Sequence, residues 1–390
     1  MVNPFQFARI PKIFFKTGQL SSLPDIISTY GNKIILVTGQ KSFLGSGNAN
    51  TLFNAFESKG IEYHIITIAG EPSPGMIDQA VKGLNGKPID AIVAIGGGSV
   101  LDAGKAIAAM MYKTESVKEY LEGVGTLAHS GTKLPVIAVP TTSGTGSEAT
   151  KNAVISHIGR NGFKKSLRHD NFVPEVAIVD PALTLNCPRH ITTASGMDCF
   201  TQLCEAYLSD KSNEYTDALA IEGLKTIKSS LRRSIVNGND IDARTGMSFA
   251  ALTSGICLAN AGLGVVHGFA SSIGAICNIP HGVVCGTLMS SANKVNVRNL
   301  RLTSDNNVAL RKYILLGKLF LDGDGKSDNY YIDGFIQYLY NITDEFHLPR
   351  LKEYGLAIND LENICKMTEN KNNPVNLTTE DLMEIVTSRL

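Results

Sequence analysis

Residues 91–102 read AIVAIGGGSVLD, an apolar run that ends in three glycines and then continues with helical spacing. A strand buried on both faces is apolar throughout, and glycines after it allow a tight turn into a helix. The chain around this stretch repeats the alternation. Helices are predicted at residues 42–59, 76–84 and 101–111, and strands at residues 33–38, 61–68, 91–95, 135–139 and 176–179. This alternation predicts an α/β domain whose parallel sheet is covered on both faces.

The second half of the chain changes period. Apolar residues recur at helical spacing, as in residues 219–231 and 249–263, and strand patterns nearly vanish. We therefore expect an α/β domain over residues 1–185 and an all-helical domain over residues 186–390. A hinge is expected at residues 180–188, where two prolines interrupt both patterns.

Composition limits the partners that we expect. The 390 residues contain 36 Lys and Arg against 36 Asp and Glu, and this balance argues against nucleic acid or an anionic membrane as the main partner. No apolar run reaches the roughly 18 residues of a spanning helix, and residues 1–15 lack the pattern of an export signal. The 7 cysteines include no CxxC pair, which disfavours a disulfide scaffold or a zinc ribbon. We expect a cytoplasmic protein.

Two loops at strand ends indicate a dinucleotide site. Gly96, Gly97, Gly98 and Ser99 join a strand to a helix, an arrangement that offers backbone N–H groups and the positive helix end to a phosphate. Ser99 either caps this helix or donates to the phosphate. The loop at residues 140–148, PTTSGTGSE, adds several hydroxyls at the carboxyl end of another strand. Two such loops favour a dinucleotide site over plain tight turns.

A second group of residues points to a metal. A helix predicted to begin near Asp198 places Gln202 one turn later on the same face. In one unbroken helix His267 and His281 would lie about 21 Å apart. Pro280 breaks the helix, so that the chain turns back toward His267. The four side chains form a candidate site for a divalent cation, with satisfied core histidines as the alternative interpretation.

These motifs occur in an order and spacing that resembles the iron-containing alcohol dehydrogenase family, the metal-dependent group III of the dehydroquinate-synthase-like superfamily. The resemblance covers nearly the whole chain and rests on residues 94–99 with Asp102 and Lys105, 140–148, 179–181, 194–198, 205–207, 266–268 and 280–282. It implies a Rossmann-like dinucleotide-binding domain, an all-α C-terminal domain and a cleft between them. It also implies NAD(P)-dependent hydride transfer between an alcohol or aldehyde and nicotinamide, in a homodimer or larger homo-oligomer.

The resemblance assigns roles to individual residues. It implies a divalent metal, Fe or Zn, that polarises the substrate oxygen and is bound by Asp198, Gln202, His267 and His281. All of these except the glutamine are also expected to be catalytic. NADP or NAD is expected to contact Gly39, Lys41, Gly96, Gly97, Gly98, Ser99, Asp102, Thr141, Thr142, Thr145 and Lys164. Lys164 falls where the family has a basic residue near the nicotinamide ribose, although Lys165 beside it can serve equally.

The chain departs from the family pattern at several positions. Gln202 replaces a ligand histidine, and its amide oxygen is a weaker ligand for Fe(II) or Zn(II), so we expect a weakly held metal. Ser271 replaces a histidine near the substrate, so a titrating proton relay is missing there, and His169 is an open candidate near the cleft. Gly39 replaces an aspartate of NAD-preferring members. With Lys41 able to pair with a 2′-phosphate, we expect NADP to be accepted.

Two alternative functions stay open on the sequence. One is a superfamily reductase of the maleylacetate type, which works without metal, although the set of Asp198, His267 and His281 favours a metal-dependent enzyme. The other is a dinucleotide-binding sensor with degraded catalysis, which the replacements at Gln202 and Ser271 allow.

Overall fold

The computed structural model describes residues 4–303 and 308–390, and its α/β half is built on a parallel sheet. This sheet has 6 strands in the order β1-β8-β5-β4-β2-β3. The strands are β1 (Lys12–Phe15), β2 (Lys33–Gly39), β3 (Glu62–Ile68), β4 (Ala91–Gly96), β5 (Val136–Pro140) and β8 (Val176–Val179). All of the expected strands are confirmed, whereas β1 was not predicted because it is short and lies half-exposed at the sheet edge.

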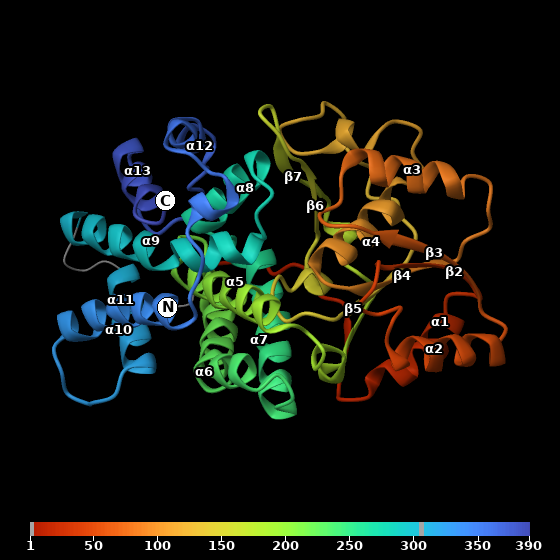
Figure 1. The fold of residues 1–390 in the computed structure, drawn as a ribbon, viewed down its shortest axis with the longest axis horizontal. Helices are drawn as coiled ribbons and strands as arrows, with labels where there is room; N and C mark the ends of the chain where they lie inside the picture. Colours follow the sequence, from red (N-terminus) through yellow and green to blue (C-terminus); the bar gives the residue numbers. More distant parts are fainter. Residues whose placement is uncertain (1–3, 304–307) are drawn as a thin grey trace.

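Helices cover both faces of this sheet (Figure 1). Ile34 and Leu36 of β2 pack with the helices α1 (Leu23–Ser28) and α2 (Gly47–Ser58) on one face. The intervening Ile35 and Val37 pack on the other face, with the helices α3 (Pro74–Leu84) and α4 (Gly98–Met110). Since successive side chains of a strand point to opposite faces, a strand buried on both must be apolar at every position.

A hairpin that the sequence did not predict lies beside the main sheet. It pairs β6 (Asn152–His157) with β7 (Phe163–Arg168) in antiparallel register. Figure 1 shows it between the sheet half and α8 of the helical half. The sequence of β7 shows no clear alternation of apolar and polar residues. Some of its polar side chains are buried because they form ion pairs, as Lys164 does with Glu71, and not because they are apolar.

The rest of the described chain, from residue 189 onward, is helical, as expected. Its helices are α5 (Arg189–Leu208), α6 (Glu214–Val236), α7 (Ile241–Ala261), α8 (Val265–Ile276), α9 (His281–Thr303), α10 (Val308–Phe320), α11 (Asp328–Glu345), α12 (Leu361–Met367) and α13 (Thr379–Thr387). Short 3₁₀ helices connect elements at Gln19–Ser22, Val117–Tyr120, Ser147–Ala149, Asp170–Phe172, Pro181–Thr184, Leu351–Tyr354 and Ile358–Asp360. The domain boundary at residues 185 and 186 stays a prediction.

The helix α5 is the buried centre of the helical half. It begins at Arg189 and not near Asp198, as we expected, so Asp198 lies in mid-helix. The polar first turns concealed this start, because the hydroxyls of Thr193 and Ser195 are satisfied by carbonyls of the helix itself. From Gly196 to Leu208 every side chain of α5 is buried. Polar side chains on this stretch are therefore enclosed by protein.

Residues 5–8 lie against the helical half. The ring of Phe5 lies 5.1 Å from that of Tyr215 on α6, and the Ala8 N–H donates to Asn260 on α7 at 2.6 Å. Across residues 4–303 and 308–390, no single helix has the length and apolar character to cross a membrane. Together α7 and α8 meet those criteria, but they are bent by 97°.

Candidate active site

A cleft of about 1210 Å³ lies between the carboxyl edge of the sheet, the β6–β7 hairpin and the helices α5, α8 and α9. This exceeds the range of roughly 300–1,000 Å³ typical of ligand pockets. The predicted site residues that line it are Gly97, Gly98, Ser99, Asp102, Thr142, Thr145, Lys164, Asp198, Gln202, His267 and His281. Those that lie outside its lining are Gly39, Lys41, Gly96 and Thr141.

The glycine turn brings the two predicted loops into contact. The helix α4 begins at Gly98 with Gly97 as its N-cap, so Ser99 lies in the first helical turn and does not cap the helix. The first N–H groups of a helix have no partner within it and remain available to an anion. A Cβ at Gly98 would lie 2.8 Å from Oγ1 of Thr145, and one at Gly97 would lie 3.3 Å from Oγ1 of Thr142. Only glycine permits this close approach of the loops.

Asp102 and Lys105 fasten α4 to its surroundings. One carboxylate oxygen of Asp102 accepts the Ser147 hydroxyl at 2.5 Å, and the other accepts the Val154 N–H at 3.0 Å. Lys105 is buried and lies 3.1 Å from the same carboxylate, and it also donates to the Ser147 carbonyl at 2.9 Å. Both oxygens of Asp102 are thus satisfied by protein. These contacts hold the start of α4 in place, where the phosphate cradle is predicted at Gly97, Gly98 and Ser99, while direct contact of Asp102 with a cofactor stays a prediction.

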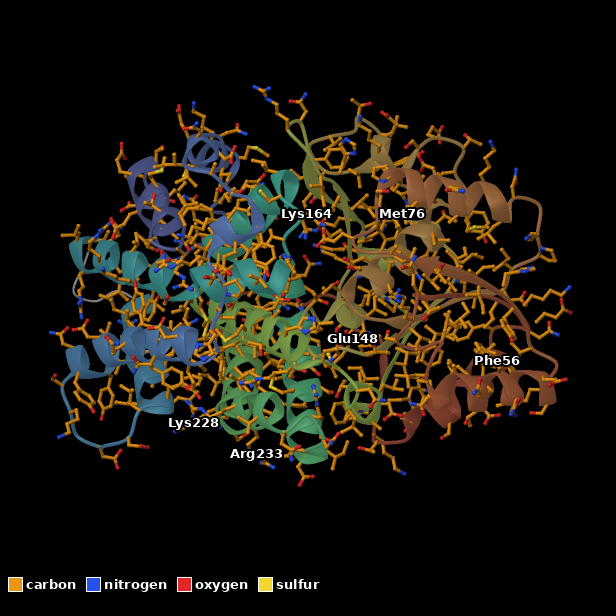
Figure 2. All side chains as sticks on the ribbon, viewed as in Figure 1. Phe56, Met76, Glu148, Lys164, Lys228 and Arg233 are labelled. Atoms are coloured by element: carbon orange, nitrogen blue, oxygen red, sulfur yellow. The ribbon has the colours of Figure 1, made fainter. Side chains whose placement is uncertain are left out.

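Lys164 enters the cleft from β7, and Lys165 does not. Lys164 is 7% exposed and forms an ion pair with Glu71, which also accepts the Ser156 hydroxyl at 2.6 Å. Burial alone would raise the pKa of Glu71, but Lys164 and Ser156 bring it below its ordinary value. Lys165 pairs with Glu369 at 3.1 Å, and its side chain is 36% exposed. Figure 2 shows Lys164 at the boundary of the two halves.

Three of the predicted metal ligands converge. Oδ1 of Asp198 on α5 lies 3.5 Å from Nε2 of His267 on α8 and 3.5 Å from Nε2 of His281 on α9. The expected break is present, since α8 ends at Ile276 and α9 begins at His281. Oδ1 of Asp198 is buried and has no hydrogen-bond partner among the residues that the structure describes. An unpaired buried carboxylate oxygen is costly, and a cation would satisfy it.

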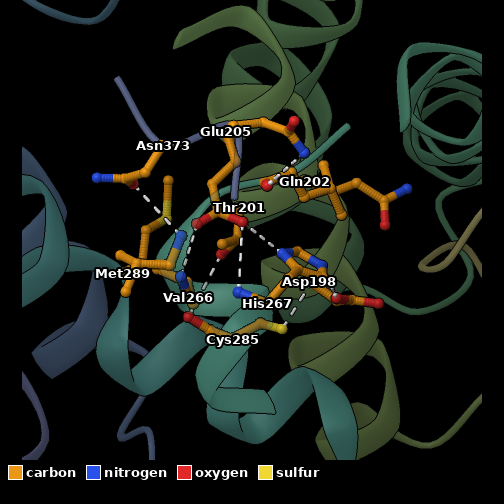
Figure 3. A network of polar contacts seen from close by, with 12 residues as sticks. Asp198, Thr201, Gln202, Glu205, Val266, His267, Cys285, Met289 and Asn373 are labelled. Atoms are coloured by element: carbon orange, nitrogen blue, oxygen red, sulfur yellow. Dashed lines mark hydrogen bonds and ion pairs between the residues drawn. The ribbon is translucent and has the colours of Figure 1, made fainter. Parts of the chain in front are cut away.

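Glu205 orients one of these histidines. It lies two turns after Asp198 on α5, and its Oε2 is 2.6 Å from Nδ1 of His267 (Figure 3). Its other oxygen accepts the Val266 N–H at 2.7 Å. A carboxylate on the far ring nitrogen sets the orientation of a ligand histidine. Glu205 received no role from the sequence, although its spacing of two turns from Asp198 was a usable signal.

Cys285 is a further member of the cluster that sequence reasoning missed. It lies one turn after His281 on α9, and its Sγ is 3.7 Å from Nε2 of His281 and 3.8 Å from Nε2 of His267. The donor atoms of Asp198, His267, His281 and Cys285 all lie within 4.8 Å of one another. Burial raises the pKa of the Cys285 thiol to about 12 in the absence of a cation.

The ring nitrogens of the two histidines differ in proton affinity. Burial alone would lower the pKa of His267, but its contacts with Cys285, Asp198 and Glu205 raise it above its ordinary value. Burial lowers the pKa of His281 to about 4, against the attraction of Asp198.

The remaining predicted residues have other partners. Gln202 donates from Nε2 to the Thr145 carbonyl at 3.0 Å and to the Ser254 hydroxyl at 2.9 Å, which links α5 to the hydroxyl-rich loop. The Ser271 hydroxyl donates to the carbonyl of residue 267 in its own helix at 3.1 Å. His169 lies outside the cleft lining, where its Nδ1 accepts the N–H of residue 171 at 3.0 Å. The histidines His190 and His347, to which the sequence assigned no role, do line the cleft.

One cleft is lined both by Gly97, Gly98 and Ser99, where a phosphate cradle is predicted, and by Asp198, His267 and His281, where a cation is predicted. Metal-assisted hydride transfer is the chemistry that requires a dinucleotide and a cation on either side of one small substrate. The fold and the site are therefore those of a nicotinamide-dependent oxidoreductase.

Known proteins identify the family within this class. The family model described as "Iron-containing alcohol dehydrogenase" matches residues 11–181, and "Fe-containing alcohol dehydrogenase family, C-terminal" matches residues 192–390. Alcohol dehydrogenase 4 of Saccharomyces cerevisiae (strain YJM789) is 30% identical over 97% of this chain and 96% of its own. The chain belongs to the iron-containing alcohol dehydrogenase family. It is an alcohol dehydrogenase, as the sequence predicted.

Solved structures support the same assignment. The crystal structure of 1,3-propanediol oxidoreductase matches 100% of both chains with a TM-score of 0.89 and 26% identity. The structure of sulfoacetaldehyde reductase from Bifidobacterium kashiwanohense in complex with NAD⁺ matches 99% of both chains with a TM-score of 0.85 and 25% identity. The division into a parallel-sheet half and a helical half is thus the fold of this family.

Proposed function

We propose that the protein transfers hydride between a small alcohol or aldehyde and NAD(H) in this cleft, with a divalent cation held beside the substrate. The observation that carries the proposal is the unpaired Oδ1 of Asp198, buried at equal distances from Nε2 of His267 and of His281. The donor set of one carboxylate and two imidazoles fits a divalent cation. When bound, such a cation polarises the oxygen of the alcohol or aldehyde.

The cradle is proposed to hold the dinucleotide by its pyrophosphate. Gly98 and Ser99 line the cleft in the first turn of α4, whose N–H groups have no partner within the helix, and glycine at position 97 lets the phosphate approach. Thr142 and Thr145 line the neighbouring wall. Gly96 and Thr141 are proposed to stabilise the glycine turn without lining the cleft. The Thr141 N–H donates to the Gly96 carbonyl at 2.9 Å and so joins the ends of the two neighbouring strands.

Lys164 is proposed to contact the nicotinamide ribose. Its pairing with Glu71 places an ammonium and a carboxylate together on the cleft wall, so the pair can both donate to and accept from ribose hydroxyls. Gln202 is proposed to fix the position of the cofactor relative to the cation. Its side chain links α5, which carries Asp198, to Thr145 of the loop at residues 140–148. Orientation of this kind contributes to rate by fixing the distance between the reacting carbons.

The finer assignments follow from residues and from relatives. Residues 1–185 are proposed as the dinucleotide-binding domain and residues 186–390 as the metal and substrate domain. Because Gly39 offers no carboxylate and Lys41 follows it, NADP is proposed to be accepted beside NAD. The structure of sulfoacetaldehyde reductase with bound NAD⁺ supports the use of NAD. We likewise propose that the cation is iron or zinc. The protein is proposed to form a homodimer or larger homo-oligomer and to be cytoplasmic.

Asp198→Asn tests the proposal, with Asp242→Asn on the exposed side of α7 as the matched control. Metal content after loading with Fe(II) or Zn(II) and oxidation of short alcohols by NAD and NADP are measured on the same preparations. The Asp198→Asn variant is expected to lose metal uptake and turnover while it still binds NADH. Turnover that survives both this substitution and chelation would contradict the proposal, and NADH binding without any turnover in the wild type would favour the sensor alternative.

A further inference from the structure

The most informative departure from expectation is the thiol inside the cation cluster. We propose that Cys285 supplies a thiolate ligand to the cation, so that the site consists of Asp198, His267, His281 and Cys285, with Gln202 outside it. This inference rests on the proposed function, because it assumes that the cluster binds a cation at all. It changes the set of proposed ligands and, with it, the metal that the site is expected to prefer.

Four of the six distances among the donor atoms agree with a tetrahedral site. Bonds of about 2.0–2.1 Å to nitrogen or oxygen and about 2.3 Å to sulfur give tetrahedral edges of roughly 3.4 Å between oxygen and nitrogen and roughly 3.6 Å between sulfur and nitrogen. The two edges from Oδ1 of Asp198 to the histidine Nε2 atoms are both 3.5 Å. The two edges from Sγ of Cys285 are 3.7 Å and 3.8 Å. Both kinds of edge lie close to the values for a bound cation.

A protonated thiol explains this arrangement less well. Cys285 is fully buried, and its sulfur lies at similar distances from Nε2 of both histidines. A thiol has a single weak S–H donor and can satisfy only one of two acceptors. A thiolate that shares a cation with both imidazoles accounts for both distances. It also accounts for the unpaired Oδ1 of Asp198, which lies within the same cluster.

Gln202 is engaged elsewhere. Its amide nitrogen is held by the Thr145 carbonyl and by the Ser254 hydroxyl, so the amide group is fixed by the cofactor loop and by α7. With its amide nitrogen in these two hydrogen bonds, Gln202 links α5 to the cofactor loop and to α7, and we place the fourth ligand on α9 instead. There, Cys285 follows His281 by one helical turn and shares its face.

A thiolate changes the preference of the site. It is softer than imidazole or an amide oxygen and adds a negative charge, so the site should prefer Zn(II) or Co(II) over Fe(II). It also replaces the lost histidine with a stronger ligand than glutamine. The weak metal retention expected from Gln202 alone is therefore offset.

Co(II) loading of the metal-free protein, kept reduced, tests the assignment directly. Sulfur-to-cobalt charge transfer in the near-ultraviolet reports a thiolate ligand independently of activity. We expect this band in the wild type and its loss in Cys285→Ser, with Co(II) binding weakened at least about 100-fold, because even the outer partners of ligands contribute 10–100-fold. Cys257→Ser is the control, since Cys257 is buried on α7 outside the cluster. It and Gln202→Ala should retain the band.

The outcomes separate the two proposals. Co(II) uptake by the wild type without a charge-transfer band would overturn the role of Cys285 and leave the proposed function intact. A band that persists in Cys285→Ser would also overturn it. If the wild type takes up neither Co(II) nor Zn(II), the proposed cation itself fails and this inference with it. The wild-type spectrum alone decides the point if Cys285→Ser does not fold, which its circular dichroism and melting temperature will show.

Discussion

The carboxylate of Glu205 on α5 lies 2.6 Å from Nδ1 of His267 on α8, where Glu205 is buried and His267 is partly buried. This contact orients Nε2 of the histidine toward Asp198, on the opposite side of the ring. Asp198 and Glu205 belong to the same helix, α5. This one rigid element therefore positions both the proposed ligand Asp198 and the carboxylate that orients His267. The spacing between Asp198 and the carboxylate that orients His267 is therefore set within one helix.

Glu205→Gln should weaken cation binding by about 10–100-fold, since an amide no longer fixes the tautomer and orientation of His267. Competition with a chelator measures this affinity. NADH binding, followed by fluorescence, should not change, because Glu205 does not line the cleft. Glu222→Gln, on the exposed face of α6, is the control. Unaltered cation affinity in Glu205→Gln would rule out the orienting role.

Lys164→Ala should raise KM for NAD(H) at least about tenfold with a smaller effect on kcat, because a hydrogen bond from a charged donor contributes about 1.5–3 kcal/mol. Lys165→Ala should leave both constants near the wild type, since Lys165 pairs with Glu369 outside the cleft. Steady-state kinetics on the two variants make this comparison. Lys164→Ala also leaves the Glu71 carboxylate without its ion-pair partner. The double variant with Glu71→Gln removes that charge and is therefore measured as well. A normal KM in that double variant would indicate a structural role only.

The buried carboxyl of Glu148, at the boundary shown in Figure 2, makes stability depend on pH. Burial raises its pKa from 4.5 to about 7, so the folded state binds this proton more tightly than the unfolded state does. Its contribution is full below pH 4.5 and is lost as pH rises through about 7. Glu148→Gln should remove this dependence.

Relative to the wild type, Glu148→Gln should gain about 3 kcal/mol in unfolding free energy between pH 4.5 and pH 7, from a shift of about 2.5 units at 1.36 kcal/mol each. Urea unfolding at several pH values provides the measurement. Parallel stability curves for the two proteins would show that Glu148 does not titrate in this range.

Gly39→Asp should lower the ratio of kcat/KM for NADP over NAD at least about tenfold, since a carboxylate there repels a 2′-phosphate. A side chain fits at this position, because a Cβ would lie 3.8 Å from the Ser42 hydroxyl, an ordinary contact. Gly39→Ala adds the same Cβ without charge and should keep the wild-type ratio. A wild type that strongly prefers NAD, or a Gly39→Asp variant with an unchanged ratio, would contradict the assignment of Gly39 and Lys41.

Apolar continuity and helical period were sufficient to predict most of the fold. The strands β2, β4, β5 and β8 were predictable because burial on both faces demands apolar residues at every position. The hairpin of β6 and β7 was not, because β7 buries polar side chains through partners distant in sequence, such as Glu71 for Lys164. Local pattern does not record a partner of that kind.

The sequence by itself determined the glycine turn and the set of Asp198, His267 and His281, since spacing and a proline break are local properties of the chain. Tertiary structure decided which neighbours joined them. Glu205 and Cys285 stand at helical spacing from predicted ligands, but such spacing only says that two residues share a face. What that face meets depends on the packing of α5, α8 and α9 against one another, which brings four donor atoms within 4.8 Å.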